Sequence, residues 1–316
     1  MCGIIGVINS KRASEFLLGG LGILSTRGYD GYGIAFTGCD PIKTGPKELD
    51  KLKELVTSSK CVTTTGIAHN RWATHGIAND INAHPHKSDP ITIVHNGDLD
   101  NYEALKKELI ELGYDFYSET DSEVFAVLVA HYRKQYSLFD AVHEALLRLG
   151  PTSRFAFLVM DDTTPDTIIV ARRGSNPILW AHVRNTVYLA SQASVFNGYA
   201  TEYHELPEGH IVEITSHGSE QIKNFTGEFQ ENLKKYTLGN DFSVGEKTTE
   251  YWMYQEMKQA AKTVRDALGH RATIENGIFL GGLEKSEIQK RLKEIDQFII
   301  AGCGTSYHAA EIIAMT

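Results

Sequence analysis

Cysteine is scarce in this chain of 316 residues, and the four cysteines that occur lie far apart. Cys2, Cys39, Cys61 and Cys303 form no Cys-x-x-Cys pair and no Cys/His pair with zinc spacing. We therefore expect neither a disulfide framework nor a structural metal site. Such sparse cysteine usage is typical of a reducing compartment, so a cytoplasmic location is predicted.

Long apolar runs and an excess of positive charge are also missing. No hydrophobic stretch is long enough to span a bilayer, and the first residues lack the basic start and apolar core of a signal peptide. Lys and Arg number 31 against 40 Asp and Glu, which gives a formal net charge of −9. Because nucleic acids and membrane surfaces are anionic, we expect neither as a partner, and small ligands are favoured.

Hydrophobic residues make up 42% of the chain, enough to bury a sizeable core. Short β-branched runs at 4–8, 63–69, 90–101, 155–160, 166–173, 186–191 and 210–215 read as strands. Helical spacing marks 14–28, 101–113, 122–135 and 137–150. Strands outnumber helices and come in hairpin-like groups, so an α+β fold with layered sheets is favoured over a doubly wound parallel sheet.

Two of these predicted helices have a clear apolar face. In the first, the face consists of Phe16, Leu17, Leu21 and Leu24, and in the second it consists of Leu105, Leu109 and Leu112. A polar, glycine-containing segment follows residue 215 and predicts the end of a domain and a linker, with the boundary near residue 240. Residues 241–316 then read as helices at 249–271 and 284–295, followed by a strand, a tight glycine loop and a helix at 297–316. We interpret them as the start of a second domain.

Cys2 becomes chemically interesting if Met1 is removed. The residue then carries a thiol and a free α-amino group, whose pKa of about 7.7 to 8.0 suits a general base near neutral pH. An amine in this place can take the thiol proton, so no separate catalytic histidine is required. The alternative is that Cys2 is only a small residue buried in the first strand.

The segment at 68–86, "AHNRWATHGIANDINAHPH", gathers polar side chains between a strand and a loop. Arg71 offers a planar fork for a carboxylate, while Trp72, Thr74 and His75 could form the wall of a cleft. The alternative is a surface loop with one buried tryptophan and with its later histidines solvated. A metal site built from the histidines is disfavoured, because no carboxylate stands at ligand spacing, and no metal ion or other cofactor is expected.

Two further motifs admit both a structural and a chemical interpretation. Asn96-Gly97 after a strand is a usual hairpin turn, but an asparagine amide and a glycine N–H can also form an oxyanion hole. Asp121 stands where a helix begins, with Ser118 or Thr120 as possible caps. A carboxylate there could equally bind an ammonium group, and with Arg71 it would grip a free α-amino acid.

Six segments occur in the order and at nearly the spacing found in class II glutamine amidotransferase domains. They are "MCGIIGVI", "RGYDGYGIA", "RWATHG", "NAHPH", "HNGDLDNY" and "SETDSEV". The chain resembles these domains, and "RGYD" with "WATHG" points to the branch that passes ammonia to fructose 6-phosphate to make glucosamine 6-phosphate. Later, "YWMYQEMKQ" and "IIAGCGTSY" resemble that branch's interdomain segment and the first strand and loop of its sugar-isomerase (SIS) domain.

The resemblance implies a four-layer αββα sandwich of the N-terminal nucleophile hydrolase type over residues 1–240, followed by the first elements of an α/β SIS domain over 241–316. It implies that Cys2 attacks the glutamine side-chain amide to form a thioester while Asn96 and Gly97 stabilise the oxyanion. Arg71 would hold the α-carboxylate of L-glutamine and Asp121 its α-ammonium group.

The remaining residues that the resemblance assigns have pocket-lining, supporting or sugar-phosphate-binding roles. Trp72, Thr74 and His75 would line the pocket on a loop that closes over glutamine, Arg27 and His84 would support the site, and Thr305 and Ser306 would bind the sugar phosphate through the glycine loop at a helix N-terminus. Fructose 6-phosphate would be a substrate only together with the rest of the isomerase half. A homo-oligomer is compatible with the sequence, which does not determine how many chains associate.

Two other functions remain open at this point. One is a non-catalytic fragment that binds glutamine or a partner synthase chain. The other is an N-terminal nucleophile hydrolase that acts on different acyl groups, which Arg71 and Asp121 argue against because such acyl groups lack the zwitterion that this pair would grip.

Overall fold

A computed structural model describes residues 2–61, 63–229 and 233–238, together with separate short segments between residues 254 and 314. The chain divides into two compact units, Met1–Val244 and Gly245–Thr316. In the part of the chain that the structure describes, no helix combines the length and the apolar character needed to cross a membrane.

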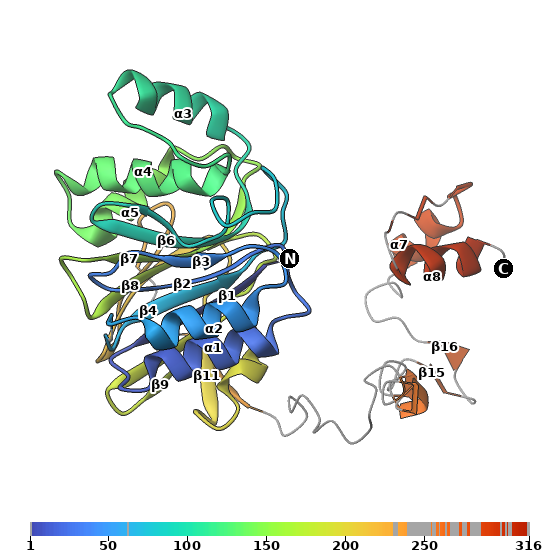
Figure 1. The fold of residues 1–316 in the computed structure, drawn as a ribbon. Coiled ribbons are helices and arrows are strands. Elements are labelled where there is room, and N and C mark those ends of the chain that lie inside the picture. The colour runs from blue at the N-terminus through green and yellow to red at the C-terminus, as the bar shows by residue number, and fades with distance from the viewer. Residues whose placement is uncertain are drawn as a thin grey trace. The chain divides into compact units, whose positions relative to one another are not determined.

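Two antiparallel sheets form the centre of the first unit (Figure 1). Across the larger sheet the order is β14 (Lys235–Thr237), β11 (Glu202–Glu205), β9 (Leu179–Val183), β10 (Thr186–Ala190), β1 (Gly3–Ile8), β4 (Gly66–Asn70), β2 (Tyr32–Phe36) and β3 (Ile42–Thr44). Across the smaller sheet it is β13 (Gly218–Asn224), β12 (His210–Thr215), β8 (Thr167–Arg173), β7 (Arg154–Asp161), β6 (Ile91–Asp98) and β5 (His86–Ser88).

Helices cover the outer face of each sheet. The larger sheet carries α1 (Ala13–Ile23) and α2 (Leu49–Ser58), and the smaller sheet carries α4 (Asp121–Arg133) and α5 (Leu138–Leu147), while α3 (Tyr102–Glu111) packs on α4. A short 3-10 helix, η1 (Ala193–Phe196), follows β10. The four layers are therefore helix, sheet, sheet and helix, as the resemblance predicted.

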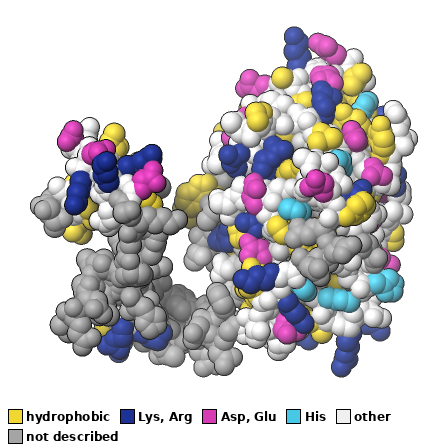
Figure 2. Space-filling view, turned by 180° about the vertical axis from the view of Figure 1, so that it is seen from behind, with side chains coloured by type: hydrophobic (Ala, Val, Ile, Leu, Met, Phe, Trp, Pro, Cys, Tyr) yellow, Lys and Arg dark blue, Asp and Glu magenta, His cyan; other side chains and the backbone are white. Residues whose placement is uncertain are grey.

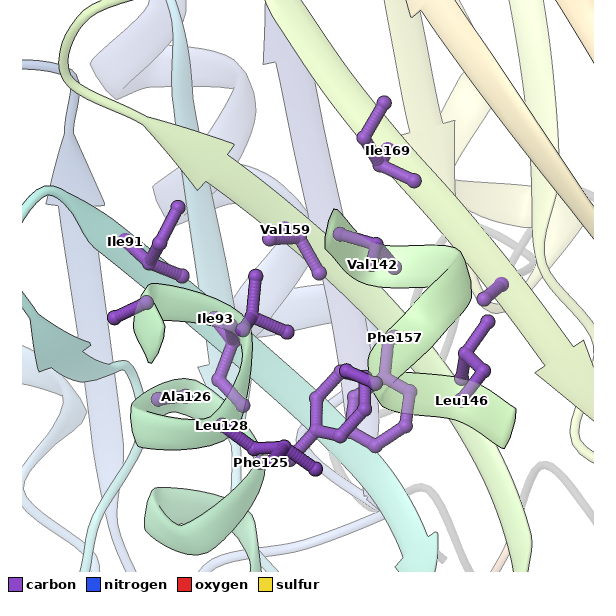
Figure 3. Packing of buried hydrophobic residues seen from close by; sticks show 14 of the residues in the cluster. Ile91, Ile93, Phe125, Ala126, Leu128, Val142, Leu146, Phe157, Val159 and Ile169 are labelled. Atoms are coloured by element: carbon purple, nitrogen blue, oxygen red, sulfur yellow. The ribbon is translucent and has the colours of Figure 1, made fainter. Parts of the chain in front are cut away.

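Central strands are buried on both faces, and the alternation of their side chains explains why. In β7, Phe155, Phe157 and Val159 belong to the cluster beneath the helices, whereas Ala156, Leu158 and Met160 belong to the cluster between the sheets. Successive strand residues point to opposite faces, so one strand fills two layers. Figure 3 shows the helix-side cluster, in which the rings of Phe125 from α4 and Phe157 stack with centroids 4.0 Å apart.

The predicted helical faces are largely confirmed, with one exception. Phe16, Leu17 and their partners in the first helix are buried, as are Leu105 and Leu109 in α3. Leu112 was expected beside them but is 55% exposed. The helix ends at Glu111, and Gly113 takes a positive φ of 90°, so the chain turns before Leu112 reaches the core.

The expectation of no disulfide is wrong for one pair of cysteines. Cys39, in the turn after β2, is bonded to Cys61, which follows α2, although the two are 22 residues apart in sequence. Both pack against the cluster beneath α1. Spacing gave no sign of this pair, because only the return of the chain through α2 brings the two segments together.

The second unit contains a short hairpin of β15 (Ala272–Thr273) and β16 (Gly277–Ile278), and the helices α7 (Ser286–Leu292) and α8 (Thr305–Ala314). The helices at 284–295 and after the glycine loop were predicted. Ile299 and Ile300, which were expected in a strand, are in coil, and no neighbouring strand pairs with them among the described residues. The assignment of this unit to a SIS domain stays a prediction.

Charge is mixed on the face of the first unit that Figure 2 shows. Lys and Arg side chains alternate with Asp and Glu over the described residues of this face instead of gathering into a basic stripe. The absence of nucleic acid as a partner stays a prediction.

Candidate active site

The nucleophile predicted from the sequence lies at the start of the central strand of the larger sheet. Cys2 is 9% exposed, and the pairing of Gly3 with Asn70 brings it beside the chain that leaves β4. There the backbone N–H of Trp72 donates to Cys2 Sγ at 3.2 Å. The sulfur is thus held at a fixed point by β-sheet register.

Burial raises the pKa of the Cys2 thiol, and the effect exceeds the opposing influence of the Trp72 N–H and the charge of Arg71. The protonated thiol therefore dominates near neutral pH. Since the thiolate is the reactive form, a base must take the proton before Cys2 can attack a carbonyl carbon.

Asn96 lies in β6 of the other sheet and reaches the nucleophile. Its Oδ1 accepts the backbone N–H of Cys2 at 3.1 Å, and its own carbonyl accepts the Nδ2 of Asn176 at 3.0 Å. Its Nδ2 is buried and has no hydrogen-bond partner among the described residues. An unpaired buried donor is costly, so this amide group is available for an oxygen atom bound next to Cys2.

Gly97 follows Asn96 within the strand, so the hairpin-turn interpretation of Asn-Gly is wrong. β6 continues through Asp98 and pairs Gly97 with Phe155. Gly97 has a φ of 153°, and a Cβ there would lie 1.9 Å from the carbonyl oxygen of Arg154. Only glycine fits this close approach of two strands, and Gly97 lines the same cavity as Cys2.

Arg71 lies in the cavity wall and organises the loop that follows it. Its guanidinium donates to the carbonyls of His75, Gly76 and Ile77. Burial lowers the pKa of Arg71, whereas the nearby carboxylates and Cys2 raise it. The predicted role of Arg71 in binding a carboxylate is not tested by these contacts, which engage some of its five N–H donors.

Asp121 is the first residue of α4 and is 4% exposed. The helix is capped by Thr120, whose side chain accepts the N–H of Glu123, so capping does not need Asp121. Instead, Asp121 Oδ2 accepts the N–H of Leu99 at 3.0 Å. Its carboxylate faces the cavity, where a cation could satisfy the charge.

Trp72, Thr74 and His75 also line this cavity, and their predicted contact with glutamine stays a prediction. The Trp72 ring is 44% exposed and lies edge-on to Tyr29, with centroids 5.9 Å apart. The surface-loop alternative required a buried tryptophan, and the exposure of Trp72 contradicts it. Arg27, predicted as a supporting residue, donates from Nη1 to the carbonyl of Ser191 at 3.0 Å, and burial lowers its pKa.

The histidines next to the site are buried, which also contradicts the surface-loop alternative. His69, His84, His86 and His95 are each at most 5% exposed, and the rings of His69 and His84 lie 4.0 Å apart. Burial lowers the pKa of all four, that of His69 to about 3, so they are neutral at physiological pH. His84 lines the cavity, and both of its ring nitrogens lack a partner among the described residues.

Sequence reasoning missed Asp98. Its Oδ1 lies 3.2 Å from Nε2 of His75, and its carboxylate is close to that of Asp121. The alternation of side chains in a strand could have indicated it. Asn96 and Asp98 are two residues apart, so their side chains leave β6 on the same face. His95 and Ser122 were also missed and line the cavity.

The tentative sugar-phosphate residues, Thr305 and Ser306, are the first two residues of α8. Their side chains and most of the preceding glycine loop lie outside the described residues, so their predicted role stays a prediction.

Residues 69–198 match the family model described as a glutamine amidotransferase domain. Similar curated proteins are glutamine–fructose-6-phosphate aminotransferases (isomerizing). That of Chlorobaculum tepidum is 37% identical over 99% of this chain and 52% of its own length, and that of Escherichia coli K12 is 34% identical over 99% and 51%. The chain thus spans about half the length of the curated relatives it matches.

Solved structures support the fold. Glutamine phosphoribosylpyrophosphate amidotransferase from B. subtilis is 26% identical and matches with a TM-score of 0.60 over 73% of this chain and 50% of that chain. An allosteric regulatory enzyme of purine biosynthesis is 27% identical with a TM-score of 0.61 over 71% and 49%. These neighbours confirm the predicted α+β sandwich of the N-terminal nucleophile type.

Proposed function

We propose that this chain, which matches the glutamine amidotransferase domain over residues 69–198, is a member of that family and hydrolyses the side-chain amide of L-glutamine with Cys2 as nucleophile. The observation that carries the proposal is the contact between the two sheets at Cys2. The residue that would supply the thiol and the residue that would supply the oxyanion donor, Asn96, touch each other at 3.1 Å.

The reaction uses the free amine that removal of Met1 creates. The α-amino group of Cys2 takes the thiol proton, and the sulfur attacks the amide carbon of glutamine. Asn96 Nδ2 and the Gly97 N–H stabilise the negative oxygen of the tetrahedral intermediate. The C–N bond then breaks, ammonia leaves with the transferred proton, and water hydrolyses the γ-glutamyl thioester to glutamate and free thiol.

Substrate selection follows from the charges around the cavity. Glutamine carries an α-carboxylate and an α-ammonium group, and Arg71 and Asp121 line the cavity with the complementary charges. A simple amide without the zwitterion would leave both buried charges unpaired, which is costly. This complementarity supports L-glutamine over the broad amide substrates of the second alternative.

The destination of the ammonia follows from the relatives. Their names describe amination of fructose 6-phosphate with isomerisation, and the match continues through both units of this chain. We therefore propose that residues 1–240 release ammonia for the conversion of fructose 6-phosphate to glucosamine 6-phosphate, and that residues 241–316 begin the SIS domain that uses it. The sugar step would require the half of the relatives that this chain does not span.

The proposal is tested by comparing glutamine hydrolysis by the purified chain with that of a Cys2→Ala variant. We expect the variant to lose at least about 10³-fold in kcat, because the nucleophile is gone. The intact mass of each protein must show that Met1 has been removed. Equal rates would contradict the proposal, and glutamine binding without turnover by the unaltered chain would favour the non-catalytic alternative.

A further inference from the structure

Three side chains that can bind a metal ion meet beside the proposed glutamine site. His75 comes from the loop after β4, Asp98 from the end of β6, and Asp121 from the start of α4. One ligand atom from each lies within 4.8 Å of the other two. The side chains of Asp98, His75 and Asp121 are 63%, 25% and 5% exposed, so the group extends from the surface into the cavity.

Among the described residues no Lys or Arg side chain bonds to Asp98 or Asp121; the contacts of these carboxylates with ionisable groups are His75 Nε2 at 3.2 Å from Asp98 and His95 Nδ1 at 3.9 Å from Asp121. Arg71 lines the same cavity, but its described hydrogen bonds go to three carbonyls of the 75–77 loop and not to Asp98 or Asp121. Asp121 accepts from the Leu99 N–H and the Ser122 hydroxyl, which leaves further lone pairs on its oxygens. Two carboxylates at this distance repel each other unless a positive charge binds between them.

His75 is arranged so that it can offer a lone pair to the same point. Its Nδ1 lies 3.2 Å from the hydroxyl oxygen of Thr74, and its Nε2 lies 3.2 Å from Asp98 Oδ1. In the tautomer in which Nδ1–H donates a hydrogen bond to the Thr74 hydroxyl, Nε2 carries the lone pair. This is the usual arrangement for a metal-ligating histidine. A nitrogen lone pair and a carboxylate oxygen at this distance need a proton or a cation between them.

A second observation points to a ligand in this cavity. His84 is 5% exposed, lines the same cavity, and has no partner for either ring nitrogen among the described residues. Buried polar groups are nearly always satisfied, by a bound group or by ordered water if not by protein. A hydrated cation held by His75, Asp98 and Asp121 would bring polar partners into the cavity that His84 lines.

We propose that His75, Asp98 and Asp121 bind a divalent transition-metal cation of the Zn²⁺ class, with water completing the coordination. One imidazole nitrogen and two carboxylates suit Zn²⁺, whereas Mg²⁺ and Ca²⁺ require six or more oxygen ligands. Ligand atoms at tetrahedral Zn²⁺ are about 3.4 Å apart, close to the present spacing of His75 and Asp98. Bringing all three atoms to that spacing would require rotation of the Asp98 side chain, which is 63% exposed.

The same ion would act as a competitor of the substrate. It would occupy the place in front of Asp121 where the α-ammonium group of glutamine is proposed to bind, so the cation and glutamine would exclude each other. This consequence rests on the proposed function, whereas the binding of the metal does not.

Metal binding is tested by titrating the full chain, freed of metal with a chelator that is then removed, with ZnCl₂ in a calorimeter. We expect one Zn²⁺ per chain at this site, and the Asp98→Asn variant to bind it at least about tenfold more weakly, since even loss of an outer-sphere partner costs 10- to 100-fold in affinity. Asp115→Asn, the same change at an exposed aspartate of another loop, is the matched control and should bind as the unaltered chain does. His75→Gln is a second ligand variant, and circular dichroism verifies that each variant is folded.

Unchanged Zn²⁺ affinity in Asp98→Asn and His75→Gln would overturn the site, and so would equally tight binding of Mg²⁺. If glutamine is hydrolysed, Zn²⁺ should raise the apparent KM for glutamine without lowering kcat, and this effect should weaken in Asp98→Asn. A fall in kcat alone would overturn the placement in front of Asp121. A chain without glutamine hydrolysis would refute the proposed function, while the calorimetry would still decide on the metal site.

Discussion

Asn96 uses the two ends of its amide for different purposes. The oxygen accepts the Cys2 N–H at 3.1 Å, and the nitrogen is buried without a partner among the described residues. If Met1 is removed, the oxygen would orient the new α-amino group, while the nitrogen would face the oxygen of a bound substrate. One residue thus links the proposed base to the proposed oxyanion hole.

Replacing Asn96 with Ala should therefore lower kcat for glutamine hydrolysis by about 10²- to 10³-fold, with a smaller effect on KM, because an oxyanion donor acts mainly in the transition state. Steady-state kinetics over a range of glutamine concentrations measures both constants. Asn224→Ala, at the last residue of β13 and outside the lining of the cavity, is the control and should leave kcat unchanged. A variant at Asn96 with full kcat would show that the oxyanion is stabilised elsewhere.

Among the secondary-structure elements, strands and helices bury their side chains in different ways. The alternation in β7 fills the space beneath the helices with one set of side chains and the space between the sheets with the other. Helix α3 instead has one buried face, which Leu105 and Leu109 share. Its hydrophobic pattern continues to Leu112, but the helix itself ends at Glu111.

The end of α3 gives a matched pair of substitutions. Leu109→Ala removes a side chain that is 2% exposed and should cost about 2–5 kcal/mol in the free energy of unfolding, through lost burial and a cavity. Leu112→Ala, three residues further, removes a side chain that is 55% exposed and should cost about 0.5 kcal/mol or less. Urea unfolding of both variants checks the prediction, and equal losses would contradict the observed end of the helix.

At the scale of the whole molecule, the two sheets meet at a buried group of histidines beside the site. His69, His84, His86 and His95 are neutral in the folded chain because burial lowers their pKa values. In the unfolded chain each has a pKa of about 6.5. The unfolded state therefore binds more protons below pH 6.5, so stability falls as the pH drops from about 6.5 toward the folded pKa, which is about 3 for His69.

The slope of stability against pH should reveal these histidines. The free energy of unfolding should fall steeply between pH 6.5 and 5, by up to about 1.4 kcal/mol per pH unit for each buried histidine. His84→Leu removes one of them without breaking a hydrogen bond that the structure describes and should make the slope shallower by about that amount. The exposed His217→Leu serves as the comparison, and identical slopes for the two variants would refute the explanation.

Local features of the fold could be read from the order of residues alone. Strand and helix periods predicted the layered α+β fold, because side-chain alternation is a property of neighbouring residues. Cys2, Arg71, Asn96, Gly97 and Asp121 were singled out by residue type and motif, and all of them line or adjoin one cavity. Their chemical roles remain proposals.

Which distant segments meet became known only from the folded chain. Sheet register and the stacking of two sheets bring Asp98 to His75, bury His84 and His86, and bond Cys39 to Cys61. None of these contacts has a signature in spacing, because residues far apart in the chain become neighbours only when their strands pair and pack. Leu112 is in solvent for a local reason, because α3 ends at Glu111 and the chain turns at Gly113 although the hydrophobic pattern indicated burial.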